Sequence, residues 1–88
     1  MRSLIEINKK IYDVSELKVG KWYISYYSSN NRRFLFRFKS NSYNTIYVNG
    51  CYSYYTEHYY NDNSNSFVLS NGYYCVRAKM SEVREYFP

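Results

Sequence analysis

Two Asn-Gly dipeptides constrain the fold of this chain more than any other feature of its sequence. Asn-Gly provides the two positive-φ residues of a type I′ turn, whose twist matches that of the strands it connects. Each dipeptide lies between segments in which the character of the side chains alternates. Asn49-Gly50 and Asn71-Gly72 therefore predict two-residue β-hairpins over residues 43–56 and 66–78.

Two further segments, residues 21–28 and 33–39, show the period-two alternation of half-buried strands. We expect Trp22, Ile24 and Tyr26 to point to one side of the first segment, and the three phenylalanines of the second segment to face the same interior. Together with the apolar sides of the hairpins, this gives a predicted core of ten residues: Trp22, Ile24, Phe34, Phe36, Phe38, Ile46, Val48, Phe67, Leu69 and Val76.

Short elements are expected near both ends of the chain. They are a strand near residues 4–7, one helical turn over 13–17 with Asp13 as its N-cap, and a short helix over 81–87 with Ser81 as its N-cap. Five or six short strands in 88 residues indicate one all-β domain, residues 1–88, with one C-terminal helix. The predicted architecture is a small antiparallel barrel.

Two stretches of the sequence resemble known proteins. Residues 17–23, Leu-Lys-Val-Gly-Lys-Trp-Tyr, resemble the entry to the first long strand of SH3-like barrels, where a glycine follows a hydrophobic loop residue. Residues 77–83, Arg-Ala-Lys-Met-Ser-Glu-Val, are similar to a strand-to-helix ending of small uncharacterised phage proteins, which usually has threonine and proline in place of Lys79 and Met80. The resemblance implies an SH3-like barrel and a phage or mobile-element origin, and it implies no activity.

The net charge of +5 is unevenly distributed along the chain. Residues 1–39 contain nine basic and three acidic residues, a balance of +6, and residues 40–88 have a balance of −1. A basic half favours an anionic partner, although a charge of this size also serves solubility alone. The fourteen tyrosines have two explanations as well, because an AT-rich genome also encodes many tyrosines. Codon bias does not choose a face of a strand, however, so their placement is the better evidence.

Basic and aromatic side chains are expected to share the outer surface of the sheet. Residues two apart on a strand lie about 6.6 Å from each other, close to the spacing of phosphates in a nucleic-acid strand, and rings between them can stack on bases. Strand positions that face solvent also carry Lys and Arg simply to prevent edge aggregation. The predicted site consists of the phosphate-binding residues Arg32, Arg33, Arg37 and Lys39 and the stacking residues Tyr23, Tyr27 and Tyr47.

The first predicted hairpin also has a face made only of tyrosines: Tyr43, Tyr47, Tyr52 and Tyr54. Tyrosine is enriched at binding surfaces because it buries a large rigid area at low entropic cost. If the face is exposed, it is a patch large enough to imply a partner. The alternative is that the tyrosines lie in the interior and Ile46 and Val48 lie outside. The apolar character of Ile46 and Val48 disfavours this alternative.

The sequence contains no pattern typical of catalysis or metal binding. No nucleophile elbow, phosphate loop or pair of catalytic carboxylates is present, and His58 has no partner for acid–base work, which makes it a surface histidine. Cys51 and Cys75 lack metal-ligand spacing, and the hairpin count places them on opposite faces, which disfavours a disulfide. We therefore expect no enzyme activity, no metal and no cofactor.

The expected function is binding without catalysis. No apolar run is long enough to span a membrane and Glu6 interrupts the apolar N-terminal stretch, so a cytoplasmic protein is expected. Combined with the resemblance, the surface predicts a phage-encoded anti-defence protein that captures a nucleotide signal or nucleic acid. The alternative is an inhibitor that blocks a host defence enzyme through the tyrosine face. A homo-oligomer formed through that face or an open strand edge is also expected.

Overall fold

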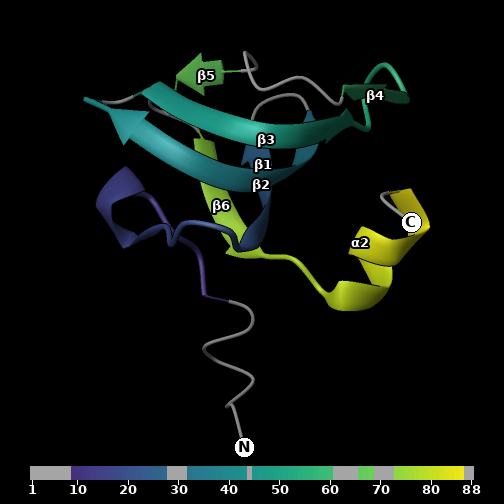
Figure 1. Cartoon of the computed structure of the whole chain (residues 1–88), viewed down its shortest axis with the longest axis horizontal. Coiled ribbons are helices and arrows are strands. Elements are labelled where there is room, and N and C mark those ends of the chain that lie inside the picture. The colour runs from purple at the N-terminus through teal and green to yellow at the C-terminus, as the bar shows by residue number, and fades with distance from the viewer. Residues whose placement is uncertain (1–8, 28–31, 44, 61–65, 69–72, 87–88) are drawn as a thin grey trace, which may run out of the picture.

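The computed structural model describes residues 9–27, 32–43, 45–60, 66–68 and 73–86, with side chains for all of these except 58–60 and 66–68. In chain order the elements are a 3₁₀ turn η1 (Val14–Glu16), the strands β1 (Trp22–Tyr27), β2 (Arg33–Ser42), β3 (Thr45–Ser53), β4 (His58–Tyr60), β5 (Ser66–Val68) and β6 (Tyr73–Arg77), and the helix α2 (Met80–Tyr86) (Figure 1). The predicted strand at residues 4–7 lies outside the described residues.

The strands form one antiparallel sheet, and the four longest, β3, β2, β1 and β6, lie side by side in that order. The short strands β4 and β5 both pair with the outer edge of β3. At the other edge, β6 makes one isolated bridge, in which Ile11 and Cys75 exchange two backbone hydrogen bonds of 2.7 and 2.8 Å. The predicted barrel is therefore wrong, because β3 and β6 pair with other segments and the sheet does not close.

The first predicted hairpin is also wrong, because Asn49 and Gly50 lie inside β3. Phe36 pairs with Cys51 and Phe38 pairs with Val48, so β3 has one residue more than β2 between these pairs. Such an extra residue is a β-bulge, and Gly50, with a φ of 136°, adopts a conformation that glycine tolerates. The turn between β2 and β3 falls instead at Tyr43, which has a φ of 59°. The second dipeptide, Asn71-Gly72, lies outside the described residues.

Both faces of the sheet are covered, which gives the protein two cores. The first core lies on the side of η1 and contains Ile11, Leu17, Tyr23, Phe36, Phe38, Ile46, Val48, Cys51 and Cys75. The second core lies under α2 and contains Ile24, Leu35, Ala78 and Val83, with Trp22, Tyr26, Tyr52, Tyr54, Val76 and Tyr86 packed around them. Figure 1 shows η1 and α2 on opposite sides of β1 and β6.

The alternation predicted within β1 and β2 is confirmed, but the relation between the two strands is not. Tyr23 pairs with Phe36, and Ile24 pairs with Leu35. Paired residues share a face of the sheet, so the phenylalanines of β2 lie with Tyr23 rather than with Ile24. Leu35, expected on the outer face, is 0% exposed.

Half of the predicted core residues are buried as expected, namely Ile24, Phe36, Phe38, Ile46 and Val48. Three more, Trp22, Phe34 and Val76, are half-buried. The side chains of Phe67 and Leu69 lie outside the described residues.

Of the two predicted helix N-caps, one is confirmed. Asp13 caps η1 as predicted, since its Oδ1 accepts a 3.0 Å hydrogen bond from the backbone N–H of Ser15. This bond lowers the pKa of the Asp13 carboxyl. At α2, the carbonyl of Lys79 accepts the first hydrogen bonds, from the N–H groups of Glu82 and Val83. Ser81 therefore lies inside the helix rather than at its N-cap.

The two cysteines are free and buried in the same core. Their predicted placement on opposite faces is wrong because of Cys75, which pairs with Ser25 of β1 and lies on the Tyr23 side of the sheet, in the first core. Cys51 does share its side with Ile46 and Val48, as expected. Burial raises the pKa of both thiols to about 12.

We expect the folded protein to resist alkylation at mildly alkaline pH, because the thiolate is the nucleophile and burial suppresses it. Iodoacetamide should modify Cys51 and Cys75 in denaturant and leave both unmodified in buffer, as measured by mass spectrometry. The ordinary thiol pKa of 9 lies below the folded value, so this contribution to stability is complete below pH 9 and lost as the pH rises toward 12. Rapid modification of the native protein would contradict the buried placement.

Candidate nucleotide-binding surface

The side of the sheet that faces α2 carries aromatic residues on its middle strand and basic residues beside them. On β1, Trp22 and Tyr26 lie on this side. Trp22 pairs with Arg37 of β2, and Tyr26 pairs with Arg33. On the other edge of β1, Tyr26 pairs with Tyr74 of β6. We call this side of the sheet the α2 face.

The two arginines of β2 are held against aromatic rings. The guanidinium carbon of Arg33 lies 4.3 Å from the centroid of the Tyr54 ring, and that of Arg37 lies 5.6 Å from Trp22. Arg37 also donates a 3.3 Å hydrogen bond from Nη2 to the carbonyl of Asn49, at the bulge. Its Nε is buried and has no hydrogen-bond partner within the described residues. Among the described residues, rings rather than carboxylates thus position these two positive charges.

Two adjoining pockets open beside α2. The first has a volume of about 410 Å³ and is lined by Gly20, Lys21, Trp22, Arg77, Ala78, Lys79 and Met80. The second has a volume of about 420 Å³ and is lined by Lys10, Ile24, Tyr26, Tyr74, Val76, Arg77, Lys79 and Glu82. Arg77 and Lys79 line both pockets. Each pocket therefore combines two lysines with at least one aromatic residue. The guanidinium carbon of Arg77 lies instead over the Tyr23 ring of the first core, 6.0 Å from the ring centroid.

The aromatic wall of the second pocket is a stack of rings. Tyr26 and Tyr74 are stacked with their centroids 5.3 Å apart and their planes 16° apart. Lys10 Nζ lies 4.9 Å from the centroid of the Tyr74 ring, and Tyr12 lies 6.0 Å from it. A planar ring and a nearby cation are the two groups that bind a nucleotide without reading its sequence.

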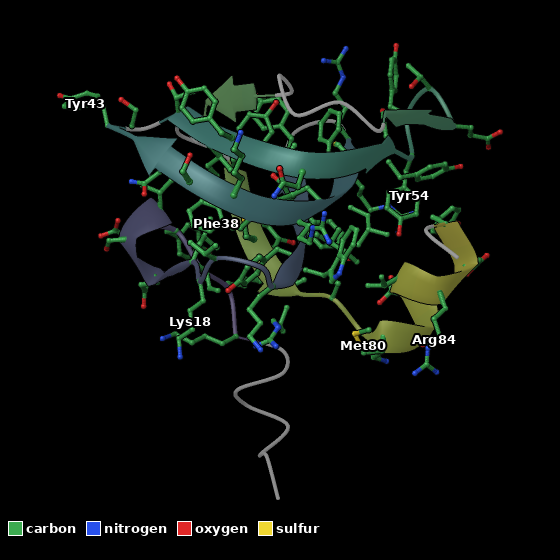
Figure 2. All side chains as sticks on the ribbon, viewed as in Figure 1. Lys18, Phe38, Tyr43, Tyr54, Met80 and Arg84 are labelled. Atoms are coloured by element: carbon green, nitrogen blue, oxygen red, sulfur yellow. The ribbon has the colours of Figure 1, made fainter. Side chains whose placement is uncertain are left out.

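A third aromatic group fixes α2 on the sheet. Tyr52 stacks on Tyr86 of α2 at 4.0 Å, and Tyr54 contacts both rings edge-on at 5.2 and 5.3 Å. Figure 2 shows Tyr54 between the end of β3 and α2. The pKa of Tyr54 is raised to about 12, mainly by burial and in part by the charge of Glu82, while the charge of Arg33 opposes the shift.

We expect Tyr54 to titrate later than an exposed tyrosine. In an alkaline titration followed by near-ultraviolet absorbance, Tyr54→Phe should remove a transition near pH 12. Because the folded pKa lies above the ordinary value of 10, this stabilisation is complete below pH 10 and lost as the pH rises toward 12. Loss of a transition near pH 10 in Tyr54→Phe would instead show that α2 leaves this ring exposed.

The structure divides the predicted phosphate-binding residues. Arg33 and Arg37 lie together on the α2 face, as described above. Arg32 lies over a different ring, 4.6 Å from the centroid of Tyr55. Lys39 is exposed where the pairing of β2 with β3 shifts by one residue. Only two of the four predicted residues therefore lie beside the pocket-lining rings of β1.

The predicted stacking residues are not on one surface. Tyr23 is wrong as a stacking residue because it is 2% exposed in the first core, where its hydroxyl accepts a 2.9 Å hydrogen bond from the backbone N–H of Lys18. Tyr27 is half-buried and stacks on Tyr73, with centroids 4.4 Å apart. Tyr47 is half-buried on β3, where it alternates with Ile46 and Val48 of the first core.

The tyrosine face is not a continuous exposed patch. Tyr43 is 93% exposed at the turn between β2 and β3. Tyr47, Tyr52 and Tyr54 are half-buried, and the last two pack against Tyr86. The helix thus uses part of the surface that the sequence assigned to a partner.

None of the residues that line the two pockets was among the predicted site residues. Those that carry charge or a ring and were assigned no role at all are Lys10, Lys21, Tyr74, Arg77, Lys79 and Glu82. The alternation of Trp22 and Tyr26 on one side of β1 was visible in the sequence. The pairing of β1 with β6, which brings Tyr74 and Val76 to that side, had no local signal. Lys21 and Lys79 are exposed, so ordinary surface usage gave no reason to select them.

The sequence matches no family model, no curated protein and no solved structure, so the site is interpreted from its geometry alone. Within the described residues, no group of three His, Cys, Asp or Glu side chains is placed to hold a metal ion. In the same part of the chain, no helix has the length and apolar character needed to cross a membrane.

Proposed function

We propose that this protein binds a nucleotide or single-stranded nucleic acid on the α2 face and performs no chemistry on it. The observation that carries the proposal is the pair of adjoining pockets, in which Lys10, Lys21 and Lys79 lie beside Trp22 and Tyr26. Basic groups attract phosphates regardless of sequence, and exposed ring faces stack on bases. In the phage setting that the sequence resemblance implies, such binding sequesters a host nucleotide signal or shields nucleic acid.

Arg33 and Arg37 support the proposal from the neighbouring strand. Arg33 and Arg37 pair with the pocket-lining residues Tyr26 and Trp22, and within the described residues neither arginine is paired with a carboxylate. An arginine that is fixed by a ring loses little further entropy when a phosphate binds. The arginines thus extend the positive surface from the pockets toward β3.

The test is binding of a fluorescent single-stranded oligonucleotide, followed by anisotropy at two salt concentrations. If three phosphates are contacted, the affinity should fall about 20-fold between about 50 and 200 mM salt. Intrinsic fluorescence gives a second readout, because Trp22 is the only tryptophan of the chain and lines the first pocket. Addition of the unlabelled strand should change its emission.

The charge reversal Lys21→Glu/Lys79→Glu should abolish this binding, because both lysines line the pockets and are exposed, so the fold tolerates the change. The matched control is Lys18→Glu, at an exposed lysine on the η1 side, away from Met80 at the start of α2 (Figure 2). Equal binding by the double variant and the control, or no binding to the wild type at low salt, would contradict the proposal.

The rival function is inhibition of a host enzyme through a tyrosine surface, and the exposure of Tyr43 favours it. A tyrosine that is 93% exposed and fixed at positive φ resembles a presented contact residue. Such an interface depends much less on salt than phosphate binding does. Loss of the biological effect in Tyr43→Ser, with the effect intact in Lys21→Glu/Lys79→Glu, would favour the rival. Sedimentation of the wild type tests the accompanying prediction of a homo-oligomer.

A further inference from the structure

The two pockets on the α2 face have similar sizes and similar contents. Each contains a ring surface, Trp22 in the first and the stacked pair Tyr26 and Tyr74 in the second. Their volumes of about 410 and 420 Å³ lie at the small end of the range for ligand pockets, roughly 300–1,000 Å³. Each therefore suits one nucleoside rather than a larger molecule.

The boundary between the pockets is basic. Lys79 lines both of them, whereas Lys21 lines only the first and Lys10 only the second. Arg77 also lines both, but its guanidinium carbon lies over the Tyr23 ring of the first core, 6.0 Å from the ring centroid. A group lying between the pockets is therefore adjacent to the positive charge of Lys79. A phosphodiester is the natural occupant, because it carries a negative charge and joins two nucleosides.

We infer that the site takes a dinucleotide unit, with one base in each pocket and the linking phosphate against Lys79. This inference rests on the proposed function and makes its ligand specific. The unit is either a free dinucleotide or two consecutive nucleotides of a single strand, which share the same chemistry.

The spacing of the rings determines the conformation of the bound unit. Trp22 and Tyr26 are four residues apart on β1, which corresponds to about 13 Å. Stacked bases lie about 3.4 Å apart, so the two bases cannot stack on each other while each contacts its own ring. The dinucleotide is bound with its bases splayed to either side of the phosphate.

The one acidic residue of the site fits a base better than a phosphate. Glu82 lines the second pocket and not the first. A carboxylate repels phosphate but accepts hydrogen bonds from the amino group of a base. Lys10, which lies over the Tyr74 ring, has an exposed and flexible side chain that can move to the phosphate when a base takes its place.

Calorimetry with adenylates of increasing length tests the inference on the full-length protein. Diadenylate should bind roughly 10- to 100-fold more tightly than adenosine monophosphate, because the second base binds intramolecularly. Tetraadenylate should bind no more than a few-fold more tightly than diadenylate. Cyclic diadenylate and a long adenylate strand distinguish the two sources. Preference for the cyclic compound identifies a free signal, and preference for the long strand identifies single-stranded nucleic acid.

Single alanine variants at exposed lysines assign the pockets without disturbing the fold. Lys79→Ala should weaken the binding of diadenylate by about fivefold or more. Lys21→Ala and Lys10→Ala should each reduce, in part, the preference for diadenylate over adenosine monophosphate. Lys18→Ala should have no effect. Equal affinity for monophosphate and dinucleotide, or affinity that increases with every added nucleotide, would overturn the two-pocket site while the proposed function stands. Absence of binding to every nucleotide tested would overturn both.

Discussion

Truncation of Leu35 to alanine should lower the free energy of unfolding by about 2–5 kcal/mol. Leu35 lies in the middle of β2, is 0% exposed and belongs to the core beneath α2. Removing its side chain leaves a cavity that the sheet on one side and the helix on the other fill only in part. Because small domains are stable by about 5–15 kcal/mol, a loss of this size is readily measured by urea denaturation.

Two other variants of β2 show whether the effect of Leu35→Ala on stability comes from a second core. Phe36→Ala, on the opposite face and also 0% exposed, should cost about 3–5 kcal/mol. Lys39→Ala, at an exposed position of the same strand, should change stability by less than about 0.5 kcal/mol. If Leu35→Ala behaved like Lys39→Ala while Phe36→Ala was severe, the sheet would have one buried face and the second core would not exist.

The two-sided core explains why the sequence predicted the strands but not the architecture. Alternation within each strand is a local property, and β1 and β2 both have it. Which side of β1 faces which side of β2 depends on the register of pairing, and a shift of one residue exchanges every side chain between the two faces. Phe36 was predicted to lie on the same face as Ile24, whereas in the structure it pairs with Tyr23 and shares the face of Tyr23. The predicted barrel assumed that all apolar sides face one interior. The structure has two interiors, one on each face of an open sheet.

The Asn-Gly prediction failed for a related reason. Asn49-Gly50 satisfies the backbone preference of a hairpin turn, but positive φ at glycine also suits a bulge within a strand. The chain turns at Tyr43, a residue without any turn preference of its own. Pairing of Phe38 with Val48 and of Phe36 with Cys51 buries these four apolar residues of β2 and β3 on one side. Long-range packing thus selects the bulge over the hairpin turn, two local structures between which the sequence alone does not decide.

The chemical character of the candidate site was predictable from the sequence, but its location was not. A basic and aromatic surface was expected, and Arg33 and Arg37 belong to it. Its pockets depend on β6 and α2, which follow β1 by about fifty residues in the chain. Arg77 and Lys79 reach β1 through the pairing of Tyr23 with Arg77 and the hydrogen bond from the N–H of Ala78 to the carbonyl of Trp22. Contacts of that sequence separation leave no local pattern.

Placing a charge beneath α2 should detach the helix and abolish ligand binding. Val83 is the buried residue of α2, 4% exposed in the second core. In Val83→Asp the carboxylate would be buried without a partner, and this costs about 3–5 kcal/mol unless the helix moves to expose it. Because Lys79, Met80 and Glu82 line the pockets at the start of α2, release of the helix also dismantles the site.

Two spectroscopic signals report the release without any ligand. Trp22 packs in the same core as Val83, so its emission should shift to longer wavelength. The pKa of Tyr54, raised to about 12 by burial, should fall toward its ordinary value of 10. The matched control is Arg84→Asp, which introduces the same residue one position further along, where the side chain points away from the sheet (Figure 2).

Arg84→Asp should leave the Trp22 emission unchanged and preserve most of the affinity, because Arg84 lines neither pocket. If Val83→Asp bound nucleotides as well as this control while its Trp22 emission shifted, the helix would be dispensable for the site. The ligand would then be held by β1 and β2 alone, with Arg33 and Arg37 as its cations. If neither signal changed, α2 would not be docked through Val83, and the second core would have to be formed by the sheet residues themselves.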